Sequence, residues 1–113
     1  MPTKPHPLAE FELLVLLAAL HLGPNDAYTA AIADYIEKRT GRSVRPANVY
    51  TTLQRLEEKR LVATRLSEPR AERGGKPRRL VTVREPGVVA VRATTGAIQA
   101  MTRELGDVLG EIG

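Results

Sequence analysis

Apolar residues recur at helical spacing through the first half of the chain and predict three helices. In the first, from about Pro7 to Leu22, they run around nearly the whole circumference, and Gly23-Pro24 is a stop signal. A helix that is apolar on all sides must be covered by protein on all sides. One small domain supplies too little cover, so we expect a partner subunit to contribute.

The two following helices are amphipathic. Asn25 or Asp26 offers an N-cap for a helix over residues 27–40, whose apolar face holds Tyr28, Ile32, Tyr35 and Ile36. Gly41 ends it. Pro46 suits the first turn of a third helix that reaches about Lys59, with a buried stripe of Val49, Leu53 and Leu56.

From Leu61 the pattern changes to the near-alternation of strands. Val62–Ser67 and Leu80–Arg84 are rich in β-branched residues, and the segment between them contains Gly74-Gly75 and several charges. These features predict a β-hairpin with a long basic tip. Three helices followed by such a hairpin are typical of a winged helix-turn-helix.

After Pro86-Gly87 the helical period returns and persists almost to the end. Val91, Ile98, Leu105 and Ile112 are spaced by seven, and Thr94, Met101 and Val108 follow the first three of them by three residues, which makes an a/d seam. A single helix of about 25 residues would be about 37 Å long. Three glycines weaken it by about 1 kcal/mol each, so it needs a partner.

The expected fold class is therefore mainly α with a small β-hairpin (α+β). Residues 1–85 form the winged helix-turn-helix domain, whose first helix is shared with a dimer interface, and residues 86–113 form a dimerisation helix.

Composition narrows the function classes. The chain has 113 residues, of which 42% are hydrophobic and 27% charged, and no cysteine. Intrinsic disorder, disulfide scaffolds, thiolate metal sites and thiol nucleophiles are thereby excluded. The longest apolar run, Leu13–Leu20, is too short to span a bilayer. We expect a soluble protein of the cytoplasm, associated with the nucleoid and not with membrane.

Charge is unevenly distributed along the chain. Residues 38–84 carry 14 basic and 4 acidic residues, a net of +10, whereas the rest carry 3 basic and 9 acidic residues, a net of −6; together they give the +4 of the whole chain. Such a basic block predicts a polyanionic partner. The alternative is a genome biased toward arginine, because 13 of the 17 basic residues are Arg.

Catalytic chemistry finds little support. The histidines His6 and His21 and the serines Ser43 and Ser67 show no spacing of a nucleophile with its base or of a metal cluster. Gly75-Lys76 is followed by Pro77, which breaks any likeness to a phosphate-binding loop. We expect no enzyme, no metal and no cofactor.

The third helix carries the candidate base-reading residues. Opposite its buried stripe lie small and polar side chains, with Arg45 just before them: Ala47, Asn48, Thr51, Gln54, Arg55 and Glu58. Asn48 and Gln54 could pair with adenine, Arg45 or Arg55 with guanine, and Thr51 with a thymine methyl group. The alternative is an ordinary solvated helix face.

The hairpin tip is the second candidate contact. Residues 69–79 hold five basic side chains against Glu72, namely Arg70, Arg73, Lys76, Arg78 and Arg79. A wing of this kind can lie over phosphates or reach into a minor groove. The alternative is a loose charged loop, and both interpretations can hold, since a free wing can become ordered only on DNA.

Several motifs together resemble the PadR family of bacterial transcriptional regulators. They are Leu22-Gly-Pro-Asn-Asp-Ala-Tyr28, the run from Ile36 to Gly41, the run from Pro46 to Val62, and Gly75-Lys-Pro-Arg-Arg-Leu80. The likeness covers about Leu8 to Gly87. It implies a homodimeric winged-helix repressor whose C-terminal helix packs on the partner's N-terminal helix, with Tyr28 and Tyr50 near the DNA backbone.

The chain departs from the family pattern at three places. Ala27 stands where Gly is common, and Arg45 replaces the usual Ser or Thr cap before Pro46. The single C-terminal helix is similar to that of the short members. Ligand-responsive relatives use a cavity at the dimer interface, so a small-molecule effector is conceivable there, although Phe11 is the only Phe and Trp is absent.

These inferences define two expected surfaces. The DNA-binding surface comprises Tyr28, Arg45, Asn48, Tyr50, Thr51, Gln54, Arg55, Arg73, Lys76, Arg78 and Arg79. The dimer interface comprises Leu8, Phe11, Val15, Val91, Ile98, Met101, Leu105 and Val108. The expected function is a dimeric, sequence-specific DNA-binding regulator, most readily a repressor. The alternative is a winged-helix module that docks on an acidic protein without reading bases.

Overall fold

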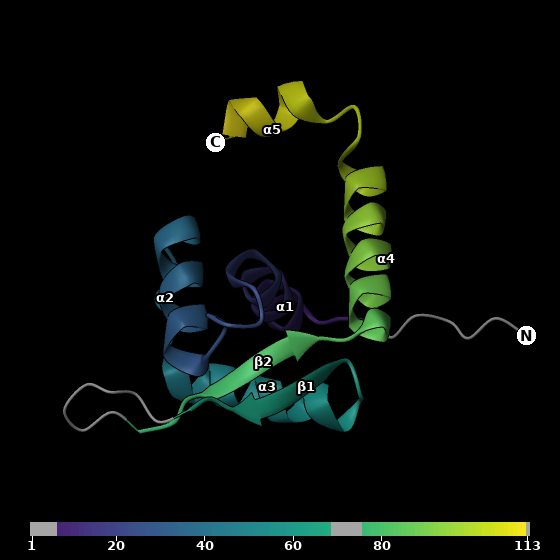
Figure 1. The fold of residues 1–113 in the computed structure, drawn as a ribbon. Helices are drawn as coiled ribbons and strands as arrows, with labels where there is room; N and C mark the ends of the chain where they lie inside the picture. Colours follow the sequence, from purple (N-terminus) through teal and green to yellow (C-terminus); the bar gives the residue numbers. More distant parts are fainter. Residues whose placement is uncertain (1–6, 69–75, 113) are drawn as a thin grey trace, which may run out of the picture.

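The structure is a computed structural model and describes residues 7–68 and 76–112. The elements follow the expected order of three helices, a hairpin and a C-terminal helical segment (Figure 1). Their bounds are α1 Glu10–Leu22, α2 Thr29–Thr40, α3 Pro46–Glu58, β1 Val62–Leu66, β2 Arg79–Val83, α4 Glu85–Thr102 and α5 Gly106–Ile112. The predicted mainly α fold with a small hairpin is confirmed.

Helix α1 begins at Glu10, three residues later than the predicted start at Pro7, and Ala9 is its N-cap. The Ala9 N–H donates to the Glu12 carboxylate at 2.9 Å, which holds the start of the helix. The helix then crosses the centre of the molecule, with Val15 and Leu16 completely buried. Most of the apolar side chains around this helix are therefore packed within its own chain.

The predicted N-cap of α2, Asn25 or Asp26, is wrong, since α2 begins at Thr29 with Tyr28 as its N-cap. The later start of α2 is caused by pairing of the preceding residues with the hairpin. The carbonyl of Ala27 accepts the Val81 N–H at 2.8 Å, and Tyr28 forms an isolated antiparallel bridge with Leu80. Residues 27 and 28 therefore stay extended along β2, and the helix starts only after them.

The core lies where the three helices meet the hairpin. Its fully buried large side chains come from every element of the domain: Leu16, Ile32, Leu56, Leu61, Val15, Val49, Val62 and Val81. The hairpin is antiparallel, with Val62 opposite Val83 and Leu66 opposite Arg79. Its two strands agree with the predicted segments to within one residue at each end.

The C-terminal segment corrects the prediction of one continuous helix. Helix α4 starts at Glu85, ahead of Pro86, and ends at Thr102; Arg103 has an extended conformation and Glu104 has a positive φ of 68° before α5 begins. Every described side chain from Gly96 to Gly110 is exposed. Little packing supports this stretch, and glycine is a poor helix former, so a break before Gly106 costs little. Figure 1 shows α4 leaving the body and α5 bending back from its tip.

Candidate nucleic-acid interface

Helix α3 presents three distinct surfaces outward from its buried stripe. Val49, Thr52, Leu53 and Leu56 are buried, which confirms the predicted stripe and adds Thr52. With 3.6 residues per turn, the side directly opposite carries Ala47, Thr51, Gln54 and Glu58, all exposed. We call these four residues the outer strip of α3.

The two flanks of the outer strip face different neighbours. Asn48 and Arg55 lie toward the start of α1 and the α2–α3 connection, where both line a cavity with Phe11 and Arg42. On the other flank, Tyr50 and Glu57 lie toward the hairpin. Asn48 and Arg55, which the sequence places among the base readers, therefore stand beside the strip and not at its centre.

The start of α3 lacks a side-chain cap, as the Arg45 substitution predicts. Arg45 is an extended, exposed N-cap residue without a capping hydrogen bond, and Pro46 follows in the first turn. Within residues 7–68 and 76–112, the Arg45 side chain makes no hydrogen bond or ion pair. Its charge is therefore available beside the N-terminal end of the outer strip.

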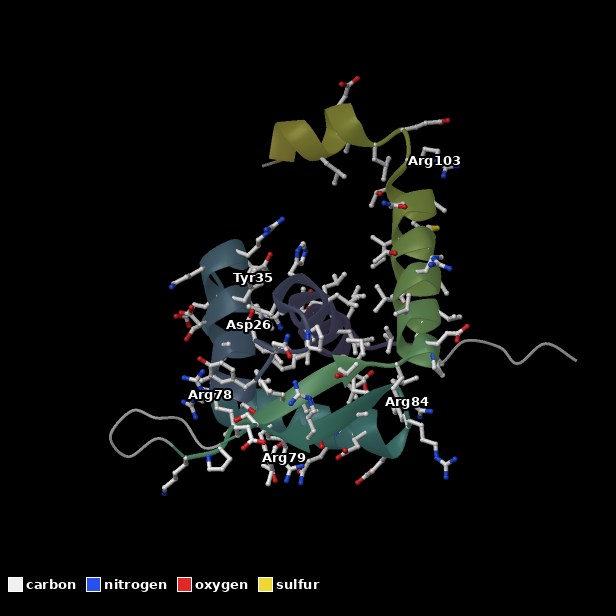
Figure 2. The ribbon with its side chains drawn as sticks, in the orientation of Figure 1. Asp26, Tyr35, Arg78, Arg79, Arg84 and Arg103 are labelled. Atoms are coloured by element: carbon white, nitrogen blue, oxygen red, sulfur yellow. The ribbon has the colours of Figure 1, made fainter. Side chains whose placement is uncertain are left out.

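The base of the wing is tied to the helices through its arginines. The Arg78 guanidinium lies 4.1 Å from the ring centroid of Tyr28, a cation–π distance. Arg79 donates from Nη1 to Oγ1 of Thr64 at 2.9 Å, and Thr64 donates in turn to Glu57 of α3 at 2.8 Å. Figure 2 shows Arg78 on the α2 side of the hairpin and Arg79 below it. Tyr28, Arg78 and Arg79 thus belong to one connected surface.

Backbone pairing continues past the strands toward the tip. The Ser67 N–H donates to the Arg78 carbonyl at 2.7 Å, and the Arg78 N–H donates to Oγ of Ser67 at 2.8 Å. Lys76 is exposed at the edge of the described segment. Arg73, which the sequence assigns to the DNA-binding surface, lies outside the described residues, as does the rest of 69–75.

Acidic residues near the start of α1 neutralise part of the basic block. Arg42 pairs with Glu10 at 2.7 Å and Lys59 with Glu12 at 2.9 Å, while Lys38 pairs with Asp34 along α2 at 3.0 Å. The linear charge count therefore overstates the positive surface. Near α3, Arg45 and Arg55 and, at the base of the wing, Arg78 and Arg79 form no ion pair within residues 7–68 and 76–112.

The Glu12–Lys59 pair links α1 to the end of α3 and is partly buried. Burial by itself would raise the pKa of the Glu12 carboxyl, but the hydrogen bonds from Lys59 and from the Ala9 N–H outweigh it. The pKa of Glu12 consequently lies below its ordinary value, so the carboxylate is charged at neutral pH.

Three contributors escape the sequence analysis. Thr64 and Glu57 anchor Arg79, and Arg42 reaches back to α1. In the hairpin register Arg79 lies opposite Leu66, and Thr64 lies two residues before Leu66 on the same strand. Only this register could have indicated the contact between Thr64 and Arg79. The Arg42–Glu10 pair joins residues 32 positions apart, and no local pattern signals it.

The residues expected at a dimer interface divide into three groups. Val15 is 0% exposed and Val91 7% exposed, so both are packed inside their own chain and have no surface left for a partner. Leu8 and Phe11 are half-buried. Ile98, Met101, Leu105 and Val108 are 40–78% exposed, which leaves a row of apolar side chains uncovered on α4 and α5.

Among residues 7–68 and 76–112, no group of three His, Cys, Asp or Glu side chains is close enough to hold a metal ion. No helix in that part of the chain combines the length and hydrophobicity needed to cross a membrane.

Known structures share this architecture. A PadR family regulator from Eggerthella lenta is 22% identical with a TM-score of 0.66, over 88% of this chain and 86% of that one. A PadR family regulator from Clostridium difficile is 18% identical with a TM-score of 0.67, over 86% and 97%. A PadR-like regulator from Bacillus cereus is 14% identical with a TM-score of 0.65, over 86% and 91%. These likenesses show the fold.

Sequence comparison places the chain more specifically. No curated protein sequence matches it. The family model described as the transcriptional regulator PadR-like family matches residues 16–93, which include α2, α3, the hairpin and the first half of α4. The chain therefore belongs to the PadR-like family of transcriptional regulators.

Proposed function

We propose that this chain is a homodimeric repressor that reads a pseudo-palindromic DNA operator with α3 and holds the flanking backbone with its wing. In this proposal residues 1–85 bind DNA and residues 86–113 join the two subunits. Two copies of α3 would enter successive major grooves, with their centres about 34 Å apart.

The observation that carries the proposal is the composition of the outer strip of α3. Ala47 and Thr51 are small, so the helix backbone can approach base edges closely. Gln54 offers an amide that fits adenine. Thr51 donates its hydroxyl to the Ala47 carbonyl at 3.1 Å, which leaves its methyl group for a thymine methyl. A winged helix that only docked on an acidic protein would have no need of this arrangement.

Charge around the strip supports the same partner. Arg45 stands at the N-terminal end of α3, Arg55 on one flank, and Arg78 and Arg79 at the base of the wing. These cations surround the strip on several sides, as phosphate contacts on both walls of a groove require. Glu58, at the far end of the strip, would repel phosphate and so limits the footprint to the first three turns.

The exposed apolar row on α4 and α5 supports the dimer. Met101 is 78% exposed and Val108 53%. Large apolar side chains that are exposed on a soluble protein can mark an interaction site, and a second copy would cover them. An effector that binds between the subunits would then act through the same row.

The proposal is tested by selecting fragments of the source genome on the purified protein and measuring the affinity of the retained duplex against random duplex at rising salt. Gln54→Ala should reduce the ratio of the two affinities about 10- to 100-fold, because a bidentate base contact contributes about 1–3 kcal/mol of discrimination. Gln99→Ala, on exposed α4, is the matched control and should leave the ratio unchanged.

Two outcomes would contradict the proposal. One is equal loss on selected and random duplex for Gln54→Ala, which would remove base reading from the outer strip. The other is that no fragment survives at high salt, which would favour the protein-docking module.

A further inference from the structure

A polar cavity of about 340 Å³ lies between α1, the α2–α3 connection and one flank of α3. Its size is near the lower end of the roughly 300–1,000 Å³ typical of small-ligand pockets. The cavity is lined by Phe11, Arg42, Ser43, Val44, Asn48, Thr51, Thr52 and Arg55. Of these residues, only Thr51 belongs to the outer strip of α3.

The lining is cationic and rich in hydrogen-bond donors. Two guanidinium groups, Arg42 and Arg55, contribute to it, and no acidic side chain does. Arg42 donates through Nη1 to Glu10 at 2.7 Å, but a guanidinium carries five N–H donors, so most of its fork is left for another acceptor. Arg55 makes no hydrogen bond or close ion pair with any described residue, although its charge helps to lower the pKa of Glu12.

Thr52 brings a largely buried side chain with an unpaired hydroxyl to this cavity. The residue is 6% exposed, and its hydroxyl has no hydrogen-bond partner within the described ranges. Within those ranges, every side-chain polar atom that is fully shielded from solvent has a hydrogen-bond partner. The Thr52 hydroxyl is therefore not fully shielded, and the cavity is the surface that Thr52 lines. A buried hydroxyl without a partner costs free energy unless solvent or a ligand satisfies it.

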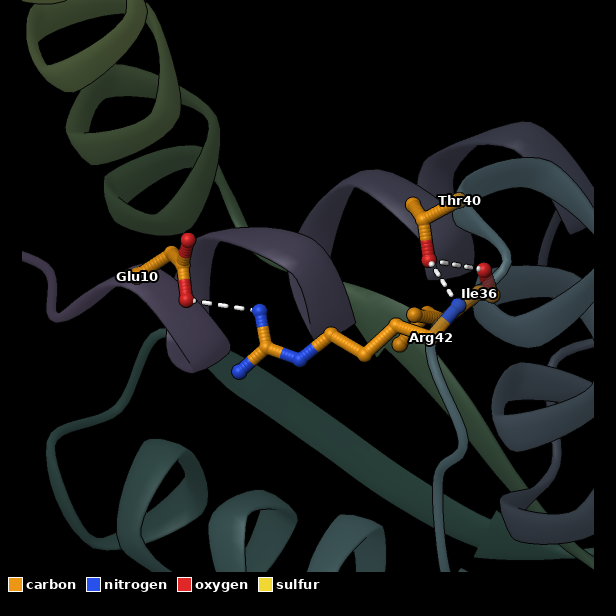
Figure 3. A network of polar contacts seen from close by, with 4 residues as sticks. All are labelled: Glu10, Ile36, Thr40 and Arg42. Carbon is orange, nitrogen blue, oxygen red and sulfur yellow. Dashed lines mark hydrogen bonds and ion pairs between the residues drawn. The ribbon is translucent and has the colours of Figure 1, made fainter.

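The rim of the cavity is held in place before any ligand arrives. Gly41 adopts the left-handed conformation with φ of 75°, and its N–H donates to the Glu37 carbonyl. The Arg42 N–H donates to Oγ1 of Thr40 at 3.1 Å, and the Val44 N–H donates to the Glu37 carboxylate at 3.1 Å. Figure 3 shows the Arg42 side chain drawn along α1 to Glu10. Its guanidinium also lies 5.8 Å from the Phe11 ring centroid.

We propose that this cavity binds a phosphate group. Two guanidinium forks with added hydroxyl and amide donors match the charge and the several oxygens of a phosphate better than those of a carboxylate. The group could come from a free phosphorylated molecule or from the DNA backbone beside α3. Only the second source rests on the proposed function, and it would make Asn48 and Arg55 residues that position α3 and do not read bases.

The first experiment uses inorganic phosphate and the full chain without DNA. Backbone amide NMR signals of residues 42–44, 48, 52 and 55 should shift and saturate with added phosphate, but not with chloride at the same ionic strength. Arg55→Gln and Thr52→Val should each weaken this binding about tenfold or more, as expected for loss of a hydrogen bond to a charged group. Thr52→Ser should retain it, and Arg92→Gln on α4 is the charge-matched control.

The second experiment separates the two sources with DNA. If a backbone phosphate enters the cavity, Thr52→Val, which changes no charge, should weaken selected and random duplex about equally, and Arg55→Gln should also lower the salt dependence by about one counterion. If only a free phosphate enters, both variants should bind DNA like the original chain, while the NMR titration still saturates.

The outcomes separate this site from the proposed function. Saturable phosphate binding in a protein that prefers no duplex would overturn the proposed function and leave the site standing. A protein that binds its selected duplex, yet shows no saturable phosphate shifts and no effect of Thr52→Val on DNA, would overturn the site.

Discussion

Gly87 is the residue where the fold tolerates no side chain. A Cβ built there overlaps the backbone carbonyl oxygen of Leu61 and comes within 2.9 Å of Cγ1 of Val83. The same Leu61 oxygen accepts the Arg84 N–H at 2.9 Å, so it cannot withdraw without losing a hydrogen bond. This close approach joins the first turn of α4 to the α3–β1 turn.

Gly87→Ala should therefore lower the free energy of unfolding by about 1–3 kcal/mol, the usual cost of overpacking. Urea denaturation at a fixed protomer concentration measures it. Gly96→Ala is the control: nothing lies within 4 Å of its added Cβ, and the helix should gain about 0.5–1 kcal/mol. A neutral Gly87→Ala would mean that the two turns are not in close contact.

The lowered pKa of Glu12 predicts how the free energy of unfolding changes as the pH falls. The pKa of Glu12 is lower in the folded chain than its ordinary value of 4.5. The stabilisation from its contacts with Lys59 and Ala9 is thus complete above pH 4.5 and is lost as the pH falls through the lower folded pKa. Glu12→Gln should remove about 1–3 kcal/mol at pH 7, because hydrogen bonds to charged groups are lost, and should flatten this acid limb.

The measurement is the unfolding free energy in urea between pH 3 and 7. Glu10→Gln serves as the comparison, because the Glu10 side chain is 73% exposed in its pair with Arg42 and exposed pairs contribute about 0.2–1 kcal/mol. An unchanged acid limb in Glu12→Gln would show that other carboxylates govern the acid response.

The wing is the element that should set affinity without setting sequence preference. Arg78 stacks on Tyr28 and Arg79 is held by Thr64, so both guanidiniums are positioned before DNA arrives. Arg78→Gln and Arg79→Gln should each weaken selected and random duplex by the same factor and lower the slope of log affinity against log salt by about 0.9.

Arg103→Gln is the control for this experiment, because Arg103 lies beyond the end of α4, far from the wing (Figure 2). Fluorescence anisotropy at several salt concentrations measures both affinity and slope. A larger loss on the selected duplex than on random DNA would mean that the wing reads bases or groove shape as well.

At the scale of elements, prediction succeeds where a local pattern decides the structure. The period of Val49, Leu53 and Leu56 locates α3, because these residues are buried on one face. The near-alternation and the β-branched residues of the two strand segments locate the hairpin. It fails where a distant contact decides. The start of α2 moves to Thr29 because β2 captures residues 27 and 28. The placement of Asn48 and Arg55 on one flank of α3, beside the cavity that they line with Phe11 and Arg42, likewise depends on contacts between distant segments.

At the scale of the whole molecule, the apolar row on α4 and α5 is not covered by any other part of the same chain that the structure describes. The heptad spacing there predicts a partner, and the break at residues 103–105 shows how weakly the segment holds its shape alone. Val15 and Val91 are used within the chain, so a dimer would be held by α4, α5 and the exposed part of α1.

Met101→Asp should therefore convert the dimer into monomer, since a charge buried against apolar residues carries a large desolvation cost. Analytical ultracentrifugation measures the mass. Leu66→Asp is the control for mass, because Leu66 is 63% exposed on β1 and lies outside the row. A monomer binds each half-site separately, so its affinity for the selected duplex should fall about 100-fold or more, while its affinity for a single half-site should not change. If Met101→Asp remained dimeric, the subunits would have to meet elsewhere, and the spacing of the two α3 helices would no longer follow from α4 and α5.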